Sequence, residues 1–269
     1  METIGFIGAG NMAEALIKGV ISSKLFAPAN VFISDIRAER LKFLSEKYGV
    51  VACEGNGELA AKVQAVVLSI KPQKMTDALE SIKDSIGNEK LVISIAAGIK
   101  VDNITSVLGE IAIVRVMPNT PALIGEGAGA LFANEKAKPM LKKVMEIFSA
   151  VGKAVVVEDE DLIDAVTALS GSGPAYYFLL MEEMIKTGVR LGLPDDVAKD
   201  LVLQTAKGAG LLAVEADSSG ESPAVLRQKV TSPGGTTEAA LEVFKEGKIS
   251  ELISAAINRA YERSKELSQ

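Results

Sequence analysis

The stretch "TIGFIGAGNMAEAL", residues 3–16, decides the fold, because a short apolar run passes through a glycine-rich turn into a helical pattern. Gly8, Gly10 and Ala13 stand there in the order G-x-G-x-x-A. In such a strand–turn–helix the first glycine permits the tight turn, the second lets backbone approach a pyrophosphate, and the third small residue lets the helix pack closely. N–H groups at the helix N-terminus then face the phosphates. The stretch predicts a dinucleotide site, with a ligand-free turn as the alternative; its residues are Gly8, Ala9, Gly10, Asn11 and Met12.

The alternation of strand and helix patterns continues to residue 158. Helical patterns such as 12–23 and 73–86 lie between short apolar runs rich in β-branched residues. These runs are 3–8, 31–34, 49–52, 65–70, 91–97, 112–117, 129–134 and 153–158. Strands that alternate with helices predict a parallel, doubly wound sheet covered on both faces. We therefore expect an α/β fold with a Rossmann-type dinucleotide-binding domain over residues 1–158.

Strand patterns end at Asp159, and residues 159–269 predict an all-α domain. Its helical patterns are 161–170, 175–193, 196–216, 236–247 and 249–267. The pattern from Tyr176 to Met181 is apolar on every side, which requires burial on every side. Because a domain of this size has little interior, we expect this helix to be buried between subunits of at least a dimer.

The composition excludes several classes of catalytic and metal-binding site. The chain has 269 residues, of which 48% are hydrophobic, and it contains no histidine. Without imidazole, Ser-His and Cys-His nucleophiles and His-ligated zinc are excluded, and we expect no metal. The single cysteine, Cys53, has no histidine to activate it, so a structural thiol is expected.

Charge and hydropathy bear on partners and location. The formal charge is −6, and no cluster of Lys and Arg offers the basic face that nucleic acid requires. The longest apolar run, Pro174 to Met181, is far shorter than the roughly 20 residues of a spanning helix. We read no signal peptide, and a single cysteine fits a reducing compartment. The expectation is a cytoplasmic protein without nucleic-acid or membrane partners.

The second strand ends in "VFISDIRAER", where the adenine ribose of a dinucleotide would lie. Asp35 suits the free hydroxyls of NAD, whereas Ser34 and Arg37, with Arg40 as a further candidate, suit the 2′-phosphate of NADP. Solvated charges at the start of a helix are the alternative.

Three later loops lie where the nicotinamide is expected, beyond the carboxyl ends of strands. They are the loop after residue 68 (Ser69, Ile70, Lys71, Pro72), the loop Ala96, Ala97 and Gly98, and the loop from Met117 to Pro121. Small, rigid loops give a nicotinamide a flat surface, which indicates hydride transfer. Lys71 fits either a cofactor contact or a solvated lysine.

A second glycine-rich stretch, "VTSPGGTTEAAL", follows in the helical part. Thr236, Thr237 and Glu238 look like the first turn of a helix capped by hydroxyls, after glycines that can adopt positive φ. Successive N–H groups at such a turn form an anion site that the helix dipole strengthens. We expect a carboxylate there, because the pyrophosphate has its own site; an ordinary capped helix is the alternative.

Residues 223–244 follow the order P-x-x-L-x-x-x-V-T-S-x-G-G-x-T-x-x-A-L-x-x-F, which resembles the signature of pyrroline-5-carboxylate reductase. The resemblance runs through the whole chain, in "GFIGAGNMAEAL", the Asn56 turn, "IKP", "AAG", "MPNTP" and "ALSGSGPAYYF". It implies NAD(P)H-dependent reduction of 1-pyrroline-5-carboxylate to L-proline, the last step of proline biosynthesis. It also implies a helical domain intertwined with a second subunit, and in many members five such dimers.

The resemblance assigns roles to residues. Thr237 matches the threonine that hydrogen-bonds the ring nitrogen of the substrate, and Asn56 joins the cofactor residues. The turn from Ser232 to Thr236, with Ser232, Gly234, Gly235 and Thr236, would hold the substrate carboxylate, and Val230 is a further substrate-binding residue. A protonated cyclic imine accepts hydride directly, which is consistent with the missing histidine because positioning and electrostatics suffice.

The sequence departs from the family pattern at two positions, and two alternative functions are compatible with its N-terminal motif. Asp35 is acidic where much of the family is neutral and prefers NADPH, and the role of Glu221 is open. A 3-hydroxyacid dehydrogenase would carry a lysine in a G-x-G-x-x-x-K pattern, but Gly171 and Gly173 lead here to Tyr177. A non-catalytic dinucleotide-binding redox sensor would have no reason to carry the carboxylate site.

Overall fold

The glycine-rich stretch forms the first strand and helix of the protein. In the computed structural model, which describes residues 1–268, β1 (Ile4–Ile7) turns at Gly8 into α1 (Asn11–Ser22). Gly8 has φ +89°, and a Cβ there would collide with the carbonyl of Ser69. Only glycine fits this turn without strain.

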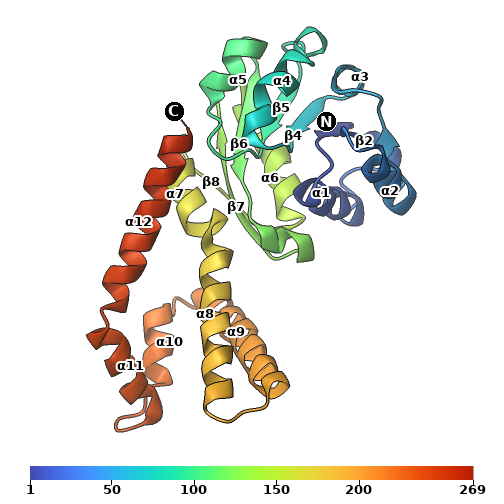
Figure 1. Ribbon diagram of the computed structural model, residues 1–269. Coiled ribbons are helices and arrows are strands. Elements are labelled where there is room, and N and C mark those ends of the chain that lie inside the picture. Colours follow the sequence, from blue (N-terminus) through green and yellow to red (C-terminus); the bar gives the residue numbers. More distant parts are fainter. Residues whose placement is uncertain (269) are drawn as a thin grey trace. The chain divides into compact units, whose positions relative to one another are not determined.

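An eight-stranded sheet in the order β3-β2-β1-β4-β5-β6-β7-β8 forms the centre of the N-terminal part (Figure 1). The other strands are β2 (Val31–Ser34), β3 (Val51–Ala52), β4 (Ala65–Leu68), β5 (Leu91–Ser94), β6 (Ala112–Met117), β7 (Gly127–Ala133) and β8 (Gly152–Val156). Each overlaps one of the eight predicted runs, although β7 begins two residues before its run and β3 covers only the second half of its own. The order of β1 to β6 is that of a Rossmann fold, with a switch point between β1 and β4.

The pairing of β7 differs from the parallel sheet that the pattern predicts. β1 to β6 pair in parallel, as in Ile4 opposite Val31 and Ala65, but β7 pairs antiparallel with β6, with Val114 opposite Ala133. Residues 118–126 connect these two strands, which is too short for the crossover that a parallel partner needs. β8 follows β7 through a helix and pairs with it in parallel.

Helices cover both faces of the sheet (Figure 1). One face packs against α1, α2 (Ala38–Tyr48) and α6 (Leu141–Ser149), and the other against α3 (Asn56–Lys62), α4 (Met75–Glu80) and α5 (Val101–Leu108). Alternate residues of β4 serve the two faces: Ala65 and Val67 join one hydrophobic core, Val66 and Leu68 the other. Short 3₁₀ turns lie at Pro28–Asn30, Pro72–Lys74, Lys83–Ser85, Thr120–Ile124 and Glu135–Met140.

The rest of the chain is helical: α7 (Leu162–Val166), a π-helical turn (Thr167–Gly171), α8 (Gly173–Arg190), α9 (Asp195–Asp217), α10 (Pro223–Lys229), α11 (Thr236–Glu246) and α12 (Ile249–Leu267). By packing, residues 1–174 with 259–268 form one compact unit and residues 175–258 a second. We call these unit 1 and unit 2. The boundary predicted at residue 158 marks where strand patterns end, and it stays a prediction.

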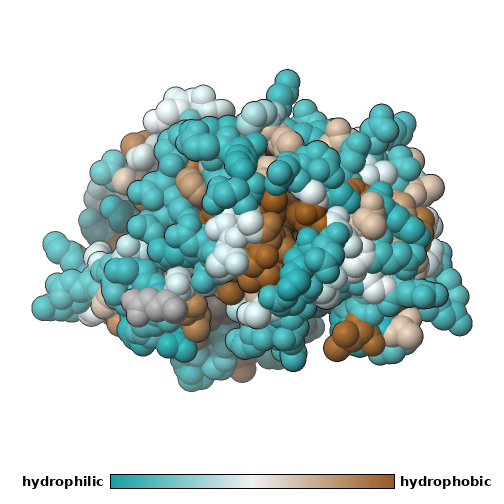
Figure 2. Space-filling model, turned by 90° about the horizontal axis from the view of Figure 1, so that it is seen from above, coloured by the Kyte–Doolittle hydropathy of each residue, from teal (hydrophilic) through white to brown (hydrophobic). Residues whose placement is uncertain are grey.

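Most of the large hydrophobic side chains that are exposed among residues 1–268 lie in unit 2. In α8, Tyr177 is 67% exposed, Phe178 60% and Leu179 59%. α8 and α9 approach closely where Gly188 meets Ala198. Figure 2 shows one face of the molecule, coloured by hydropathy, which is mostly hydrophilic with smaller groups of hydrophobic residues.

Candidate functional site

The glycine turn after β1 is fixed by the ends of two neighbouring strands. The N–H of Gly8 donates to the Ser34 carbonyl at 2.8 Å, and that of Ala9 donates to Asp35 Oδ2 at 2.7 Å. On the other side, the N–H of Ser69 donates to the Ile7 carbonyl at 2.8 Å. The turn is therefore held between the carboxyl ends of β2 and β4, at the switch point of the sheet.

The structure brings the predicted cofactor residues of unit 1 to one edge of the sheet, at the carboxyl ends of β1, β2, β4 and β5 or the start of α3. After β1 come Gly8, Ala9, Gly10, Asn11 and Met12; at β2 Ser34, Asp35 and Arg37; at α3 Asn56; after β4 Ser69, Ile70, Lys71 and Pro72; after β5 Ala96, Ala97 and Gly98. Gly10 ends the turn as the N-cap residue of α1, and no side chain among residues 1–268 caps that helix there. Its first-turn N–H groups suit an anion.

Asp35 and Arg37 form a bidentate ion pair at the end of β2. Arg37 Nε donates to Asp35 Oδ1 and Nη2 to Oδ2, both at 2.9 Å. The Arg37 hydrogen bond lowers the pKa of Asp35 to about 2, against the opposing effect of burial, and the Ala9 N–H adds to the lowering. The Asp35 side chain is 7% exposed and that of Arg37 51%. Asp35 thus stays ionised, and Arg37 balances its charge while still facing solvent.

Ser34 and Asn56 are joined at the same corner. Ser34 Oγ donates to Asn56 Oδ1 at 2.8 Å, and Asn56 Nδ2 donates to Ser81 Oγ at 2.9 Å. Ser34 is 4% exposed. Ser34 and Asn56, both predicted to bind the cofactor, are therefore hydrogen-bonded to each other in this structure.

Arg40 does not lie free beside this corner, as a 2′-phosphate ligand would. Its Nε donates to the Ala9 carbonyl at 2.6 Å, and its Nη2 forms an ion pair with Glu14. Glu14 also accepts from Lys47 Nζ at 3.0 Å and from Tyr48 Oη at 2.9 Å. Burial raises the pKa of Glu14, but the hydrogen bonds from Arg40, Lys47 and Tyr48 outweigh it and lower that pKa to about 2.

The loop after β6 is tied to the π-helical turn by one buried side chain. Asn119 Nδ2 donates to the Ser170 carbonyl at 3.0 Å, and Asn119 Oδ1 accepts from the Ala128 N–H at 2.8 Å. Gly171 packs against Met117, so the turn approaches the end of β6. π-helical turns leave backbone groups unpaired and are frequent at functional sites. The sequence motif containing Asn119 signalled a loop, but not this tie.

The predicted substrate residues lie together in unit 2, between α10 and the first turn of α11. Val230 ends α10, Ser232 to Gly235 form the turn with Gly234 at φ +71°, and Thr236 and Thr237 begin α11. The helix start is as predicted, but hydroxyl capping is wrong: Gly235 is the N-cap, and no side chain of residues 1–268 bonds there as a cap. Instead Glu238 Oε2 accepts from the Gly234 N–H at 2.7 Å, because a carboxylate reaches one turn back along the helix.

Two side chains whose roles the sequence left open or called structural are Glu221 and Cys53. Glu221, whose role the sequence left open, accepts from Lys229 Nζ at 2.6 Å across α10. Cys53 is a free, buried cysteine; burial raises its pKa, the charge of Glu58 adds to this, and Lys62 opposes it. A protonated thiol is a weak nucleophile, in agreement with the structural role expected.

Ile36 is a candidate that the sequence reading passed over. Its side chain is fully exposed between Asp35 and Arg37, directly after β2. An exposed isoleucine beside the expected ribose position offers an apolar surface to an adenine. Its position two residues after the second strand, where the adenosine of a dinucleotide is expected, could have identified it from the sequence.

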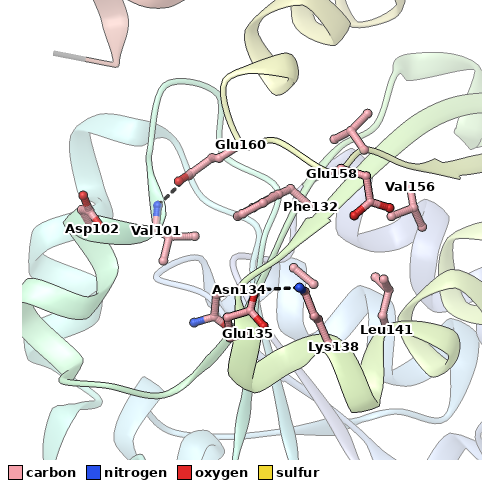
Figure 3. Close-up of a pocket in the computed structure, with 12 residues that line it drawn as sticks. Val101, Asp102, Phe132, Asn134, Glu135, Lys138, Leu141, Val156, Glu158 and Glu160 are labelled. Atoms are coloured by element: carbon pink, nitrogen blue, oxygen red, sulfur yellow. Dashed lines mark hydrogen bonds and ion pairs between the residues drawn. The ribbon is translucent and has the colours of Figure 1, made fainter.

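A cavity of about 590 Å³ in unit 1 contains none of the predicted site residues (Figure 3). Two of its acidic side chains have partners. Glu160 Oε1 accepts from the Val101 N–H at 2.7 Å and from Arg115 Nη1 at 2.6 Å, and Glu135 Oε1 accepts from Lys138 Nζ at 2.6 Å. The lining residues are Val101, Asp102, Phe132, Ala133, Asn134, Glu135, Lys138, Leu141, Val156, Val157, Glu158 and Glu160.

Among residues 1–268, no three His, Cys, Asp or Glu side chains gather as they would around a metal ion. None of the helices in this range combines the length and apolar character needed to cross a membrane.

Comparisons with known proteins identify relatives along the whole chain. A family described as pyrroline-5-carboxylate reductase dimerisation matches residues 160–267, and one described as NADP oxidoreductase coenzyme F420-dependent matches residues 3–98. The pyrroline-5-carboxylate reductase of Pseudomonas aeruginosa is 44% identical over 268 residues, which cover 99% of this chain and 97% of that protein.

Solved structures of pyrroline-5-carboxylate reductases are also similar to this chain over its whole length. A pyrroline-5-carboxylate reductase from Coxiella burnetii has a TM-score of 0.93 and 40% identity, covering 100% of this chain and 99% of its own. The Plasmodium falciparum pyrroline carboxylate reductase with NADP bound has a TM-score of 0.86 and 31% identity, covering 100% of this chain and 98% of its own.

Proposed function

The chain belongs to the pyrroline-5-carboxylate reductase family, and from that premise we propose which of its residues reduce 1-pyrroline-5-carboxylate to L-proline. The protein is an NADP-dependent oxidoreductase of proline biosynthesis that acts on a C=N bond, and it forms a homo-oligomer. One observation supports the assignment of residues: two separate glycine turns with positive φ, at Gly8 to Gly10 and at Ser232 to Thr236, each lead into the N-terminus of a helix.

The residues of unit 1 fit a dinucleotide. A Cβ at Gly10 would have no atom within 4 Å, so the backbone there is open to a pyrophosphate, and the first turn of α1 supplies N–H donors. Ser34, Arg37 and Asn56 would hold the 2′-phosphate end, and the loops at Lys71 and Gly98 the nicotinamide end. The bound cofactor supplies the hydride; the chain positions it.

We propose that the protein also uses NADH. Asp35 is ionised and can accept hydrogen bonds from free ribose hydroxyls, while Arg37 keeps the net charge of the pair near zero. A neutral corner neither strongly attracts nor strongly repels a 2′-phosphate, so both cofactors should bind, with NADPH favoured on family grounds.

The substrate carboxylate would bind at the turn before α11. The N–H of Gly234 already binds a carboxylate, that of Glu238, at 2.7 Å, which supports the anion preference of this turn. Thr237 in the first turn would hydrogen-bond the ring nitrogen and hold the protonated imine in place. No general base is needed, because the iminium carbon accepts hydride directly and the helix N-terminus holds the carboxylate.

Assembly, metal-free catalysis and location follow from the exposed surface and the composition of the chain. The exposed apolar surface of α8 supports a helical domain, residues 159–269, intertwined with that of a partner, and larger assemblies up to a decamer. The lack of histidine supports catalysis without a metal, and the single free cysteine supports a cytoplasmic location. Nucleic acid and membranes are not expected as partners of a chain with charge −6.

The test is a turnover assay of the purified protein with 1-pyrroline-5-carboxylate and either NADPH or NADH. We expect substrate-dependent loss of near-UV dinucleotide absorbance with both cofactors and L-proline as the product. A 3-hydroxyacid dehydrogenase would oxidise hydroxyacids instead, and a redox sensor would bind the dinucleotide without turnover. Either result would refute the proposed reaction.

A further inference from the structure

We infer that Arg40 and Glu14 clamp the peptide between Ala9 and Gly10, and that this clamp sets the affinity for the dinucleotide without either side chain touching it. The inference rests on the proposed function only in that the turn binds a dinucleotide. It makes Arg40 a positioning residue rather than a reader of the 2′-phosphate.

Ala9 is held from both sides by side chains. Its N–H donates to Asp35 Oδ2 at 2.7 Å, and its carbonyl accepts from Arg40 Nε at 2.6 Å. The Ala9 carbonyl and the Gly10 N–H belong to the same planar trans peptide, so they point in opposite directions. When Arg40 fixes the carbonyl toward α2, it therefore fixes the direction of the Gly10 N–H, at the N-cap of the helix that would receive the phosphates.

Arg40 is itself held by α1. Its Nη2 pairs with Glu14, which also accepts from Lys47 and Tyr48, so four side chains link the two helices. The Arg40 and Glu14 side chains are each only 19% exposed. A pair that is this enclosed has little freedom, and its geometry passes directly to the Ala9 peptide.

The same contacts argue against a direct role in reading the cofactor. Arg40 already uses Nε for the Ala9 carbonyl and Nη2 for Glu14, and Glu14 balances its charge. By contrast, the side chain of Arg37 is 51% exposed at the end of β2. The clamp should therefore affect NADPH and NADH equally, whereas a phosphate reader would affect NADPH alone.

Arg40→Met tests this, because it removes the guanidinium and keeps most of the aliphatic length. The matched control is Lys47→Met. Lys47 also donates a hydrogen bond to Glu14, but it makes no contact with the Ala9 carbonyl. NADPH and NADH are titrated separately into the full-length protein and followed by nicotinamide fluorescence. We expect Arg40→Met to raise both dissociation constants about tenfold, as for the loss of one charge-assisted hydrogen bond, and Lys47→Met to change them less than about twofold.

Steady-state kinetics supply a readout that general loss of stability would not give. At saturating NADPH, Arg40→Met should keep kcat and the KM for 1-pyrroline-5-carboxylate within about twofold of wild type, with the loss confined to the KM for the dinucleotide. Arg40→Lys should recover part of the affinity, because an ammonium can reach the Ala9 carbonyl or Glu14 but cannot span both as the planar fork does.

Weaker binding of NADPH alone would overturn the inference and make Arg40 a 2′-phosphate ligand. Unchanged binding of both cofactors would overturn it as well. If Arg40→Met does not fold, Glu14→Gln decides: it keeps an acceptor for Arg40, and we expect an equal loss of about threefold for both cofactors. A wild-type protein that binds dinucleotides but does not reduce the imine would refute the proposed reaction and leave this test intact.

Discussion

Gly8 and Gly10 lie two residues apart, yet they constrain the protein in different ways. Gly8 needs its positive φ of +89°, and a Cβ there would meet the Ser69 carbonyl. Gly10 has an ordinary φ of −72°, and a Cβ there would meet nothing within 4 Å. The fold therefore requires glycine at the first position, and only a ligand would require it at the second.

Gly10→Ala should consequently separate binding from stability. We expect an unchanged or slightly higher Tm, because alanine removes conformational freedom from the unfolded chain, and a loss of NADPH affinity of tenfold or more, roughly 1.4 kcal/mol. Thermal unfolding and dinucleotide titration measure the two effects. Gly8→Ala is the matched variant and should lower Tm by several degrees. If Gly10→Ala kept wild-type affinity, the pyrophosphate would not lie against this turn.

Thr237→Ala should lower kcat/KM by about one to two powers of ten, since one positioned hydrogen bond is worth roughly 1–3 kcal/mol in such sites. NADPH binding should be nearly unchanged. Thr231→Ala is the control, because the Thr231 hydroxyl already donates to the Arg227 carbonyl at 2.7 Å, one turn back along the chain. Wild-type turnover in Thr237→Ala would remove this threonine from the site.

The Asp35–Arg37 pair should determine the choice between NADPH and NADH. A carboxylate near a 2′-phosphate repels it by about 1–4 kcal/mol, and Arg37 offsets this. Asp35→Asn should therefore improve kcat/KM with NADPH relative to NADH, and Arg37→Ala should reverse the ratio. Lys42→Ala removes an exposed cation from α2, the helix that follows the pair, and should leave the NADPH/NADH ratio unchanged. Shifts below about twofold in both variants, an energy below RT, would show that the pair is a solvated one.

At the scale of elements, the periodicity of apolar residues predicted the positions of strands and helices. It did not predict strand direction or the hydrogen bonds that single polar side chains make. All eight strands overlap predicted apolar runs, and α12 matches its predicted helical pattern. The signal is clearest in β1, β4 and β5, which are buried at every residue, because burial on both faces leaves a continuous apolar run. The reversal of β7 follows from a short connection, and strand patterns carry no direction. The Arg40–Ala9 and Asn119–Ser170 hydrogen bonds join residues distant in sequence, and a polar residue alone does not indicate its partner.

The packing of α1 on α2 should weaken in acid. The pKa of Glu14 is about 2 in the folded protein and 4.5 when unperturbed, so its contribution is full above pH 4.5 and is lost as pH falls toward 2. Between pH 6 and 3.5 the difference in unfolding free energy between wild type and Glu14→Gln should shrink by roughly 1 kcal/mol. Urea unfolding at several pH values measures it. The exposed Glu46→Gln should show little change, and equal behaviour of the two variants would contradict the assignment.

At the scale of the whole molecule, the two units differ in how they bury apolar surface. Unit 1 encloses two hydrophobic cores, one on each face of its sheet. Unit 2 leaves residues such as Tyr177, Phe178 and Leu212 more than half exposed. The sequence indicated this contrast, because a helix that is apolar on every side cannot be covered by a small domain alone. The identity of the covering surface depends on a second chain, and a single sequence contains no record of its geometry.

An intertwined dimer predicts that subunit dissociation and unfolding are one event. Surfaces of unit 2 that are buried only in the assembly cannot stabilise a free chain, so Tm should rise by several degrees when protein concentration is raised about a hundredfold. Phe178→Glu, which places a charge on the exposed face of α8, should abolish the folded oligomer, whereas Phe43→Glu, at a half-exposed position on α2 of unit 1, should leave it intact. Sedimentation and thermal unfolding report both. A stable, well-folded monomer at micromolar concentration would rule out intertwining, because the exposed side chains of α8 would then not need a partner to remain folded.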